Sequence, residues 1–143
     1  MKKSILIIAL AIVSICFGSC GNSSSKVEKQ TVTEVAEAAP SIQILYFHGD
    51  RRCPTCIKVG EISLALFSVK YANNSVVAYK EVNTDKEENK TIAEKYQILS
   101  SSLIIDVNGT VKNITVDAFK LAKSDPAALE KMITDIIEEG LKK

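Results

Sequence analysis

The 143-residue sequence has few cysteines, little net charge and one extended apolar run. A secreted domain held together by disulfides would spread four or more cysteines along its length, but two of the four here lie within the first 20 residues. The 18 basic side chains nearly balance the 17 acidic ones, and no basic patch of the kind that binds nucleic acid is visible. The composition therefore excludes a disulfide-stapled scaffold and gives no reason to expect a nucleic-acid partner.

The extended apolar run occupies residues 5–15 and follows Lys2 and Lys3. A membrane-spanning helix needs about 20 apolar residues, so this shorter run fits the hydrophobic region of an export signal better. We predict that residues 1–20 form a signal peptide. Its removal leaves 16 of the 18 basic side chains, all 17 acidic ones and a formal charge of −1.

The end of this signal resembles a bacterial lipobox. The small residues Gly18 and Ser19 precede Cys20, although Phe17 stands where such motifs carry Leu, Val or Ile. Cys16 is less suitable because no small residue precedes it. The resemblance implies a lipid on Cys20 and a protein anchored in the bacterial cell envelope, facing the periplasm. An uncleaved anchor and a signal without lipidation are the alternatives.

Residues 21–40 are polar and end at Pro40. Such a composition cannot bury an apolar core, so we predict a flexible tether. Residues 41–143 then form one domain, which is large enough to bury a modest core without disulfide staples. We expect this domain to be monomeric.

The pattern of apolar and turn-forming residues in the domain predicts an α/β fold with the order β-α-β-α-β-β-α. The expected strands are residues 42–47, 76–82, 102–107 and 110–116, and Asn108-Gly109 is a hairpin signal between the last two. The expected helices begin near Pro54, after Asp85 and at Pro126. Strands that alternate with helices favour parallel pairing and the hairpin adds an antiparallel edge, so a mixed sheet is expected.

Two of the expected helices carry an apolar face at helical spacing. Its members are Val59, Ile62, Leu66 and Val69 in the first helix, and Leu129, Met132, Ile133, Ile136 and Ile137 in the last. We predict that both faces belong to the buried core.

The CPTC motif carries the chemistry. After export and lipidation, Cys53 and Cys56 are the only free thiols, and the tiny loop between them makes their disulfide a weak staple. The motif opens the first helix, where Pro54 is tolerated and where backbone N–H groups and the helix dipole stabilise a thiolate. We predict that Cys53 is the exposed, attacking thiol and that Cys56, one turn further, is the buried resolving thiol.

This element order, with C-x-x-C between a strand and a helix, resembles the thioredoxin fold over residues 41–140. The resemblance implies a three-layer fold around a central mixed sheet, and a thiol–disulfide oxidoreductase that acts on the dithiols and disulfides of partner proteins. Exported proteins of this kind are often reductants supplied by a membrane electron donor, so we expect a reductant. No G-x-G-x-x-G motif follows a strand, and no cofactor is expected.

A narrower resemblance surrounds the motif. The Tyr-Phe-His-Gly run of residues 46–49 and the arginine before Cys53 are similar to small thioredoxin-like proteins labelled nitrophenyl compound nitroreductase subunit ArsF. This resemblance implies a role in a nitroreductase complex. Because the sequence shows no flavin or nicotinamide site, the reduction of nitro compounds would belong to a partner.

Several positions depart from ordinary thioredoxins. The sequence has no tryptophan, and Arg52 stands where thioredoxins carry one before the first cysteine. Ser101 is the expected counterpart of their cis-proline, and its peptide bond is expected to be trans because a non-proline cis bond costs about 3 kcal/mol. Phe47 lies near the expected position of their buried acid. These differences imply that partner proteins dock differently beside the disulfide.

Charged residues flank the cysteine pair. Arg51 and Arg52 are expected to be solvated, with at least one of them lowering the pKa of the Cys53 thiol, and Asp50 would oppose them. His48 is expected to bond locally and to modulate the thiol, with a proton shuttle or a third metal ligand as alternatives. No metal site is expected, because structural zinc needs four ligands.

Other roles remain open for the cysteine pair. One is a structural disulfide in a fold that no longer does redox work. Another is a binding module, either a thioredoxin-like adaptor or a carrier of a soft metal ion such as Cu(I) held by the two thiolates.

Overall fold

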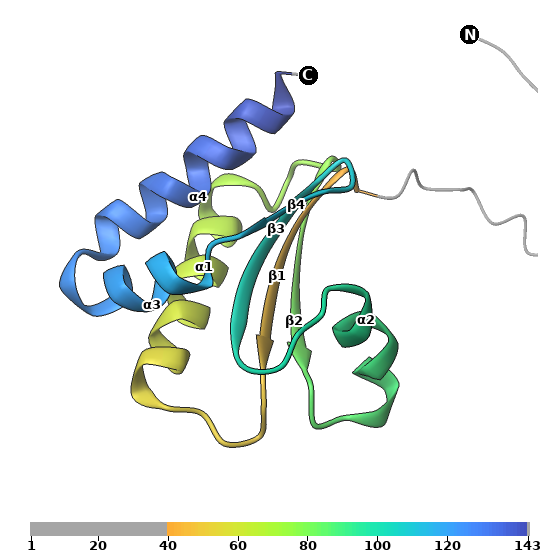
Figure 1. Cartoon of the computed structure of the whole chain (residues 1–143). Helices are drawn as coiled ribbons and strands as arrows, with labels where there is room; N and C mark the ends of the chain where they lie inside the picture. Colours follow the sequence, from red (N-terminus) through yellow and green to blue (C-terminus); the bar gives the residue numbers. More distant parts are fainter. Residues whose placement is uncertain (1–39, 143) are drawn as a thin grey trace, which may run out of the picture. The chain divides into compact units, whose positions relative to one another are not determined.

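The computed structural model describes residues 40–142 (Figure 1). The predicted signal peptide, the lipidation of Cys20 and the predicted tether up to residue 39 lie outside the described residues. They stay predictions.

Four strands form one mixed sheet in the order β2-β1-β3-β4. Strand β1 (Ile42–His48) pairs in parallel with β2 (Val77–Asn83) and antiparallel with β3 (Ser102–Val107). Strand β4 (Thr110–Asn113) forms a hairpin with β3 at one edge. The predicted mixed sheet is confirmed.

The β3–β4 turn follows from its two residues. Asn108 and Gly109 both have positive φ angles, 52° and 81°, as the tight two-residue hairpin turn requires. Asp106 stabilises this turn, because its Oδ1 accepts a hydrogen bond of 2.8 Å from the backbone N–H of Gly109. Its Oδ2 accepts a second hydrogen bond, of 2.6 Å, from the hydroxyl of Tyr96.

Helices cover both faces of the sheet. Helices α1 (Pro54–Lys70), α3 (Thr115–Ser124) and α4 (Pro126–Leu141) lie on one face, while α2 (Lys90–Lys95), with a short 3-10 turn before it (Glu87–Asn89), lies on the other (Figure 1). The predicted three-layer α/β architecture is confirmed. None of the helices within residues 40–142 has the length and apolar character needed to cross a membrane.

The central strands are buried on both faces because side chains alternate along a strand. In β1, Ile42, Ile44 and Tyr46 face the larger core under α1, α3 and α4, whereas Leu45 and Phe47 face the smaller core under α2. The predicted core residues of α4 contribute to the larger core: Leu129, Ile133 and Ile137 are fully buried, and Met132 and Ile136 pack against them.

The prediction for the segment after the hairpin was wrong in part. Strand β4 ends at Asn113 rather than at residue 116, and an additional helix, α3, precedes α4. Ile114, Ala118 and Ala122 are buried at a spacing of four, which places them on one helical face. The β-branched Val116 favoured a strand in the sequence, but its side chain is 80% exposed.

Two further boundaries differ from the prediction. Val69 is 84% exposed and lies outside the core, because α1 ends at Lys70 and the buried position is taken by Tyr71. The helix expected after Asp85 begins later, because Asn83 still belongs to β2 and α2 starts at Lys90.

Candidate redox site

The site lies where β1 leads into α1. Cys53 is the N-cap of α1, with an extended backbone (φ −73°, ψ 157°), and its Sγ accepts a hydrogen bond of 3.1 Å from the backbone N–H of Cys56. Pro54 occupies the first helical position, where a missing N–H leaves no helical hydrogen bond unmade. The cap at Cys53 and the proline after it thus place the first cysteine at the N-terminus of α1.

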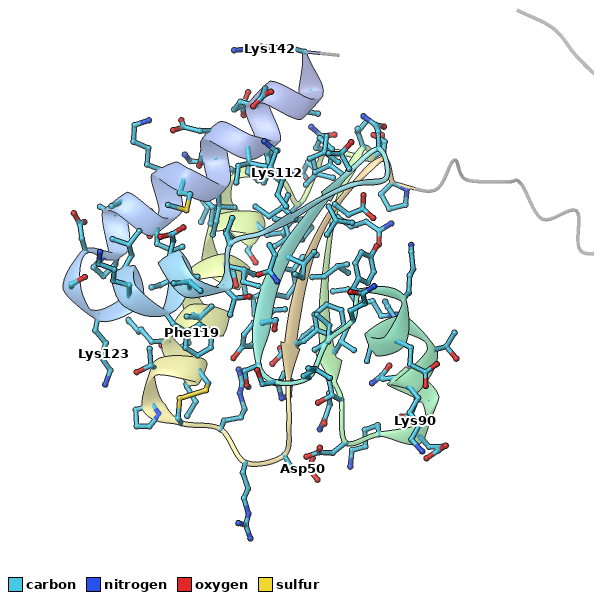
Figure 2. The ribbon with its side chains drawn as sticks, in the orientation of Figure 1. Asp50, Lys90, Lys112, Phe119, Lys123 and Lys142 are labelled. Atoms are coloured by element: carbon cyan, nitrogen blue, oxygen red, sulfur yellow. A yellow bond between two sulfur atoms is a disulfide. The ribbon has the colours of Figure 1, made fainter. Side chains whose placement is uncertain are left out.

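Cys53 and Cys56 form a disulfide, visible as the yellow bond at the start of α1 in Figure 2. Their Cα atoms are 5.0 Å apart, within the range of ordinary disulfides. Cys53 is exposed and Cys56 is only 7% exposed. The predicted difference in exposure between the two cysteines is confirmed.

Tyr46, on β1, forms a hydrogen bond with the first turn of α1. It is fully buried, and its hydroxyl donates a hydrogen bond of 2.5 Å to the carbonyl oxygen of Cys56. Burial raises the pKa of Tyr46 above the ordinary value of a tyrosine, so the phenol keeps the proton that it donates. Tyr46, rather than Phe47, is therefore the β1 side chain beside Cys56.

Phe47 points to the other side of the sheet. It belongs to the smaller core, where its ring centroid is 6.0 Å from that of Tyr96. Since successive side chains of a strand face opposite sides, Phe47 lies on the other face of the sheet from Tyr46 and cannot contact Cys56 as Tyr46 does.

Arg52 is not the solvated loop charge that the sequence suggests. Its side chain is 27% exposed, and its Nη1 lies 3.0 Å from Oε1 of Glu81. Its guanidinium carbon also lies 5.3 Å from the centre of the Tyr46 ring, within the range of a cation–π contact. The guanidinium thus lies against the sheet, in contact with Glu81 and Tyr46.

Gly60 makes room for this arrangement. A Cβ atom at this buried position would lie 2.7 Å from Cε1 of Tyr46 and 2.8 Å from Nη2 of Arg52. Both distances are too short for ordinary packing. The close approach of α1 to Tyr46 and Arg52 therefore requires a residue without a side chain.

His48 also binds Glu81. Its Nε2 lies 3.0 Å from the same Oε1 that binds Arg52, and its Nδ1 lies 2.9 Å from the carbonyl oxygen of Gly49. The His48 ring stacks on that of Tyr46, with ring centroids 5.6 Å apart. The expected local bonding of His48 is confirmed, and both ring nitrogens are engaged.

Glu81 is the site residue that the sequence analysis missed. In the parallel register of β1 and β2 it lies opposite Tyr46, and neighbouring residues of paired strands face the same side of the sheet. The period of two along β2, with Val77 and Tyr79 facing the larger core, was a signal for its direction. This periodicity could not predict which side chains Glu81 contacts, because those contacts depend on the strand register.

A second set of contacts holds the loop between β1 and α1. Asp50, labelled on this loop in Figure 2, accepts a hydrogen bond of 2.7 Å from the side-chain amide of Asn83 and lies 3.8 Å from Nζ of Lys86. Its backbone N–H donates to Oδ2 of Asp85 at 2.6 Å. The Asp50 carboxylate is thus paired with Asn83 at the end of β2 and with Lys86 in the segment that follows. Arg51 is exposed.

Ser101 lies at the same end of the sheet as the disulfide. It directly precedes β3, whose first residue, Ser102, pairs with Phe47 near the end of β1. All peptide bonds within residues 40–142 are trans, as expected for this position. The nearby Leu99 is fully exposed.

The described residues do not form a metal centre. Within residues 40–142 there is no group of three or more His, Cys, Asp and Glu side chains that could hold a metal ion. His48, the third metal ligand considered from the sequence, uses its ring nitrogens for Glu81 and Gly49.

No protein-family model matches this chain, and no curated protein does. Among solved structures, Trxlp from Edwardsiella tarda EIB202 is 20% identical, with a TM-score of 0.49 over 67% of this chain and 84% of that one. The oxidized form of mitochondrial thioredoxin 3 from Saccharomyces cerevisiae is 17% identical, with a TM-score of 0.45 over 69% and 82%. Human ERp44 form I is 16% identical, with a TM-score of 0.49 over 83% and 30%.

The chain has a thioredoxin-like fold. Its mixed sheet between two helical layers, with the C-x-x-C pair at the start of the helix that follows β1, has the arrangement expected from the sequence. The narrower resemblance to nitroreductase subunits stays a prediction from residues 46–53.

Proposed function

We propose that this protein is a thiol–disulfide oxidoreductase of the cell envelope, anchored through a lipid on Cys20, and that it reduces disulfides in partner proteins. The observation that carries the proposal is the pairing of an exposed Cys53, at the N-cap of α1, with a buried Cys56 one turn further. A partner disulfide can reach Sγ of Cys53. Sγ of Cys56 is buried, and it can react with Sγ of Cys53, to which it is already bonded in the disulfide form.

The reaction would run in two exchange steps. In the reduced protein, the Cys53 thiolate attacks one sulfur of a partner disulfide, so that a mixed disulfide forms and the other partner sulfur leaves as a thiolate. Cys56 then loses its proton and attacks Sγ of Cys53, which releases the second partner thiolate. Two electrons pass to the partner, and the Cys53–Cys56 disulfide must be reduced again by a dithiol donor.

The start of α1 supplies the stabilisation that the first step needs. The backbone N–H of Cys56 already points at Sγ of Cys53 in the disulfide form, at 3.1 Å. When the disulfide opens, the same donor and the positive end of the helix dipole favour the thiolate over the thiol. These groups are in place before the partner arrives.

A redox assay tests the proposal. We would measure the equilibrium of the Cys53–Cys56 couple with glutathione and the rate of insulin-disulfide reduction, with Cys53→Ser as the inactive control. Cys56→Ser should accumulate the mixed disulfide, because the attacking thiol remains and the resolving thiol is gone. A pair that does not exchange with dithiols but binds Cu(I) tightly would overturn the proposal and favour a metal carrier.

The anchor is tested separately. Full-length protein expressed in bacteria should incorporate a labelled fatty acid and sediment with membranes. Cys20→Ala should abolish the label, whereas Cys16→Ala should leave it unchanged. A label that survives Cys20→Ala would contradict the assignment of the lipid to this residue without affecting the redox proposal.

A further inference from the structure

The Glu81 carboxylate has no role in the exchange steps, yet it binds two residues of the redox site. Its Oε1 lies 3.0 Å from both Nε2 of His48 and Nη1 of Arg52. Glu81 comes from β2, whereas His48 ends β1 and Arg52 directly precedes Cys53. One carboxylate therefore joins the neighbouring strand to both ends of the loop that carries the first cysteine.

The contacts continue from Arg52 to the second cysteine. The Arg52 guanidinium lies against the Tyr46 ring, and the Tyr46 hydroxyl donates to the carbonyl oxygen of Cys56. Gly60 leaves the space in which Arg52 and Tyr46 approach α1. The position of Arg52 is thus defined from three sides, by Glu81, by Tyr46 and by the helix.

We infer that Glu81 is a positioning residue of the redox couple: it holds Arg52 against Tyr46 and α1 at Gly60, offsets the charge of that arginine and so keeps the Cys53–Cys56 pair reducing. The inference rests on the proposed function, and it concerns the direction of electron flow.

The sign follows from electrostatics. A positive charge near Cys53 stabilises the thiolate of the reduced form and makes the disulfide a stronger oxidant. A carboxylate paired with that positive charge cancels much of the effect. Removing the charge of Glu81 therefore leaves the Arg52 charge without its carboxylate partner and favours the reduced form. Removing the charge of Arg52 leaves the Glu81 carboxylate bound to His48 alone and favours the disulfide.

The experiment compares Glu81→Gln, Arg52→Gln and the double variant in the glutathione equilibrium at one neutral pH. Glu81→Gln preserves the size of the side chain and should shift the equilibrium constant about three- to tenfold toward the reduced form, which is roughly 15–30 mV for this two-electron couple. Arg52→Gln should shift it in the opposite direction. The double variant should lie between the two single variants.

Opposite signs are the decisive result. Mere damage to the structure would move both single variants in the same direction, and that outcome would overturn the inference, as would a Glu81→Gln equilibrium constant within about twofold of the wild type. Asp135→Asn is the matched control, because Asp135 forms an exposed ion pair with Lys131 in α4 and its replacement changes the net charge equally. It should leave the equilibrium unchanged.

A second readout separates this inference from the proposed function. The rate of Cys53 alkylation against pH gives the thiol pKa without any exchange partner. The pKa of the Cys53 thiol should fall in Glu81→Gln and rise in Arg52→Gln. If the wild type fails to exchange with dithiols, the proposed function is wrong, but these two opposite changes still decide whether Glu81 and Arg52 act on Cys53 as inferred.

Discussion

At the scale of single residues, the site depends on the absence of a side chain at one position as well as on its two cysteines. Gly60 is the clearest case, because the ring of Tyr46 and the guanidinium of Arg52 both occupy the space that a Cβ would need. The close contact brings the sheet against the first turns of α1. It therefore links the packing of the domain to the position of the cysteine pair.

Gly60→Ala should destabilise the protein by about 1–3 kcal/mol, although alanine is the better helix former by about 1 kcal/mol. The sign is set by the overlap with Tyr46 and Arg52. Urea unfolding measures the change, and Ser68→Ala, on an exposed part of α1, should stay within about 0.5 kcal/mol of the wild type. A stabilised Gly60→Ala variant would show that the close contact does not exist in solution.

The half-buried Tyr79 makes stability depend on pH in the alkaline range. Burial raises its pKa to about 12, whereas a tyrosine in the unfolded chain ionises near 10. The unfolded chain therefore loses this proton first, and the contribution to stability is complete below pH ~10 and is lost as the pH rises toward ~12.

Tyr79→Phe removes this contribution. Between pH ~9 and ~11, the wild type should lose about 1 kcal/mol more of its free energy of unfolding than the variant does, a figure reduced for partial exposure. Unfolding curves at the two pH values measure the difference. Equal losses in both proteins would mean that Tyr79 is solvated in the native state.

At the scale of elements, helix starts determine much of this fold. Cys53 caps α1 and Asp125 caps α4, and a proline follows each cap at the first helical position. Oδ1 of Asp125 accepts a hydrogen bond of 3.0 Å from the backbone N–H of Ala128. The same combination of a capping side chain and a proline thus starts both α1, which carries the cysteine pair, and α4, which packs in the larger core.

Asp125→Ala should cost about 1 kcal/mol of stability, since the N–H of Ala128 loses its acceptor. Asp125→Ser keeps a capping oxygen and should recover most of the loss. Thermal and urea unfolding of the two variants measure the difference. Two variants of equal stability would contradict the capping role, because only one of them lacks the side-chain acceptor.

At the scale of the whole molecule, two apolar cores on opposite faces of one sheet hold the domain together. The disulfide joins residues only three apart in sequence, and so small a loop restricts the unfolded chain little. We therefore expect the folded state to depend on the two cores more than on this bond.

Reduction of the disulfide should leave the domain folded and lower its free energy of unfolding by at most about 2 kcal/mol. Circular dichroism and urea unfolding with and without a dithiol reductant measure the effect. The Cys53→Ser variant should behave like the reduced protein. Loss of cooperative unfolding on reduction would show that the disulfide is a structural staple.

Much of this protein could be predicted from short stretches of sequence, because the responsible interactions are local. The Asn108-Gly109 turn, the helix start at Pro54 and the different exposure of Cys53 and Cys56 each depend on a few neighbouring residues. The strand and helix order follows from periodicity for the same reason. The helix α3 was missed, because the strand propensity of Val116 competed with the helical spacing of its buried residues.

The surroundings of the cysteines were decided only by the tertiary structure. Arg52 and Glu81 are far apart in sequence, and they meet because β1 and β2 pair in a parallel register that places Glu81 opposite Tyr46. A shift of that register by one residue would turn Glu81 to the other face of the sheet. The sequence by itself thus determined which cysteines form the couple, and the strand pairing determined which charges act on it.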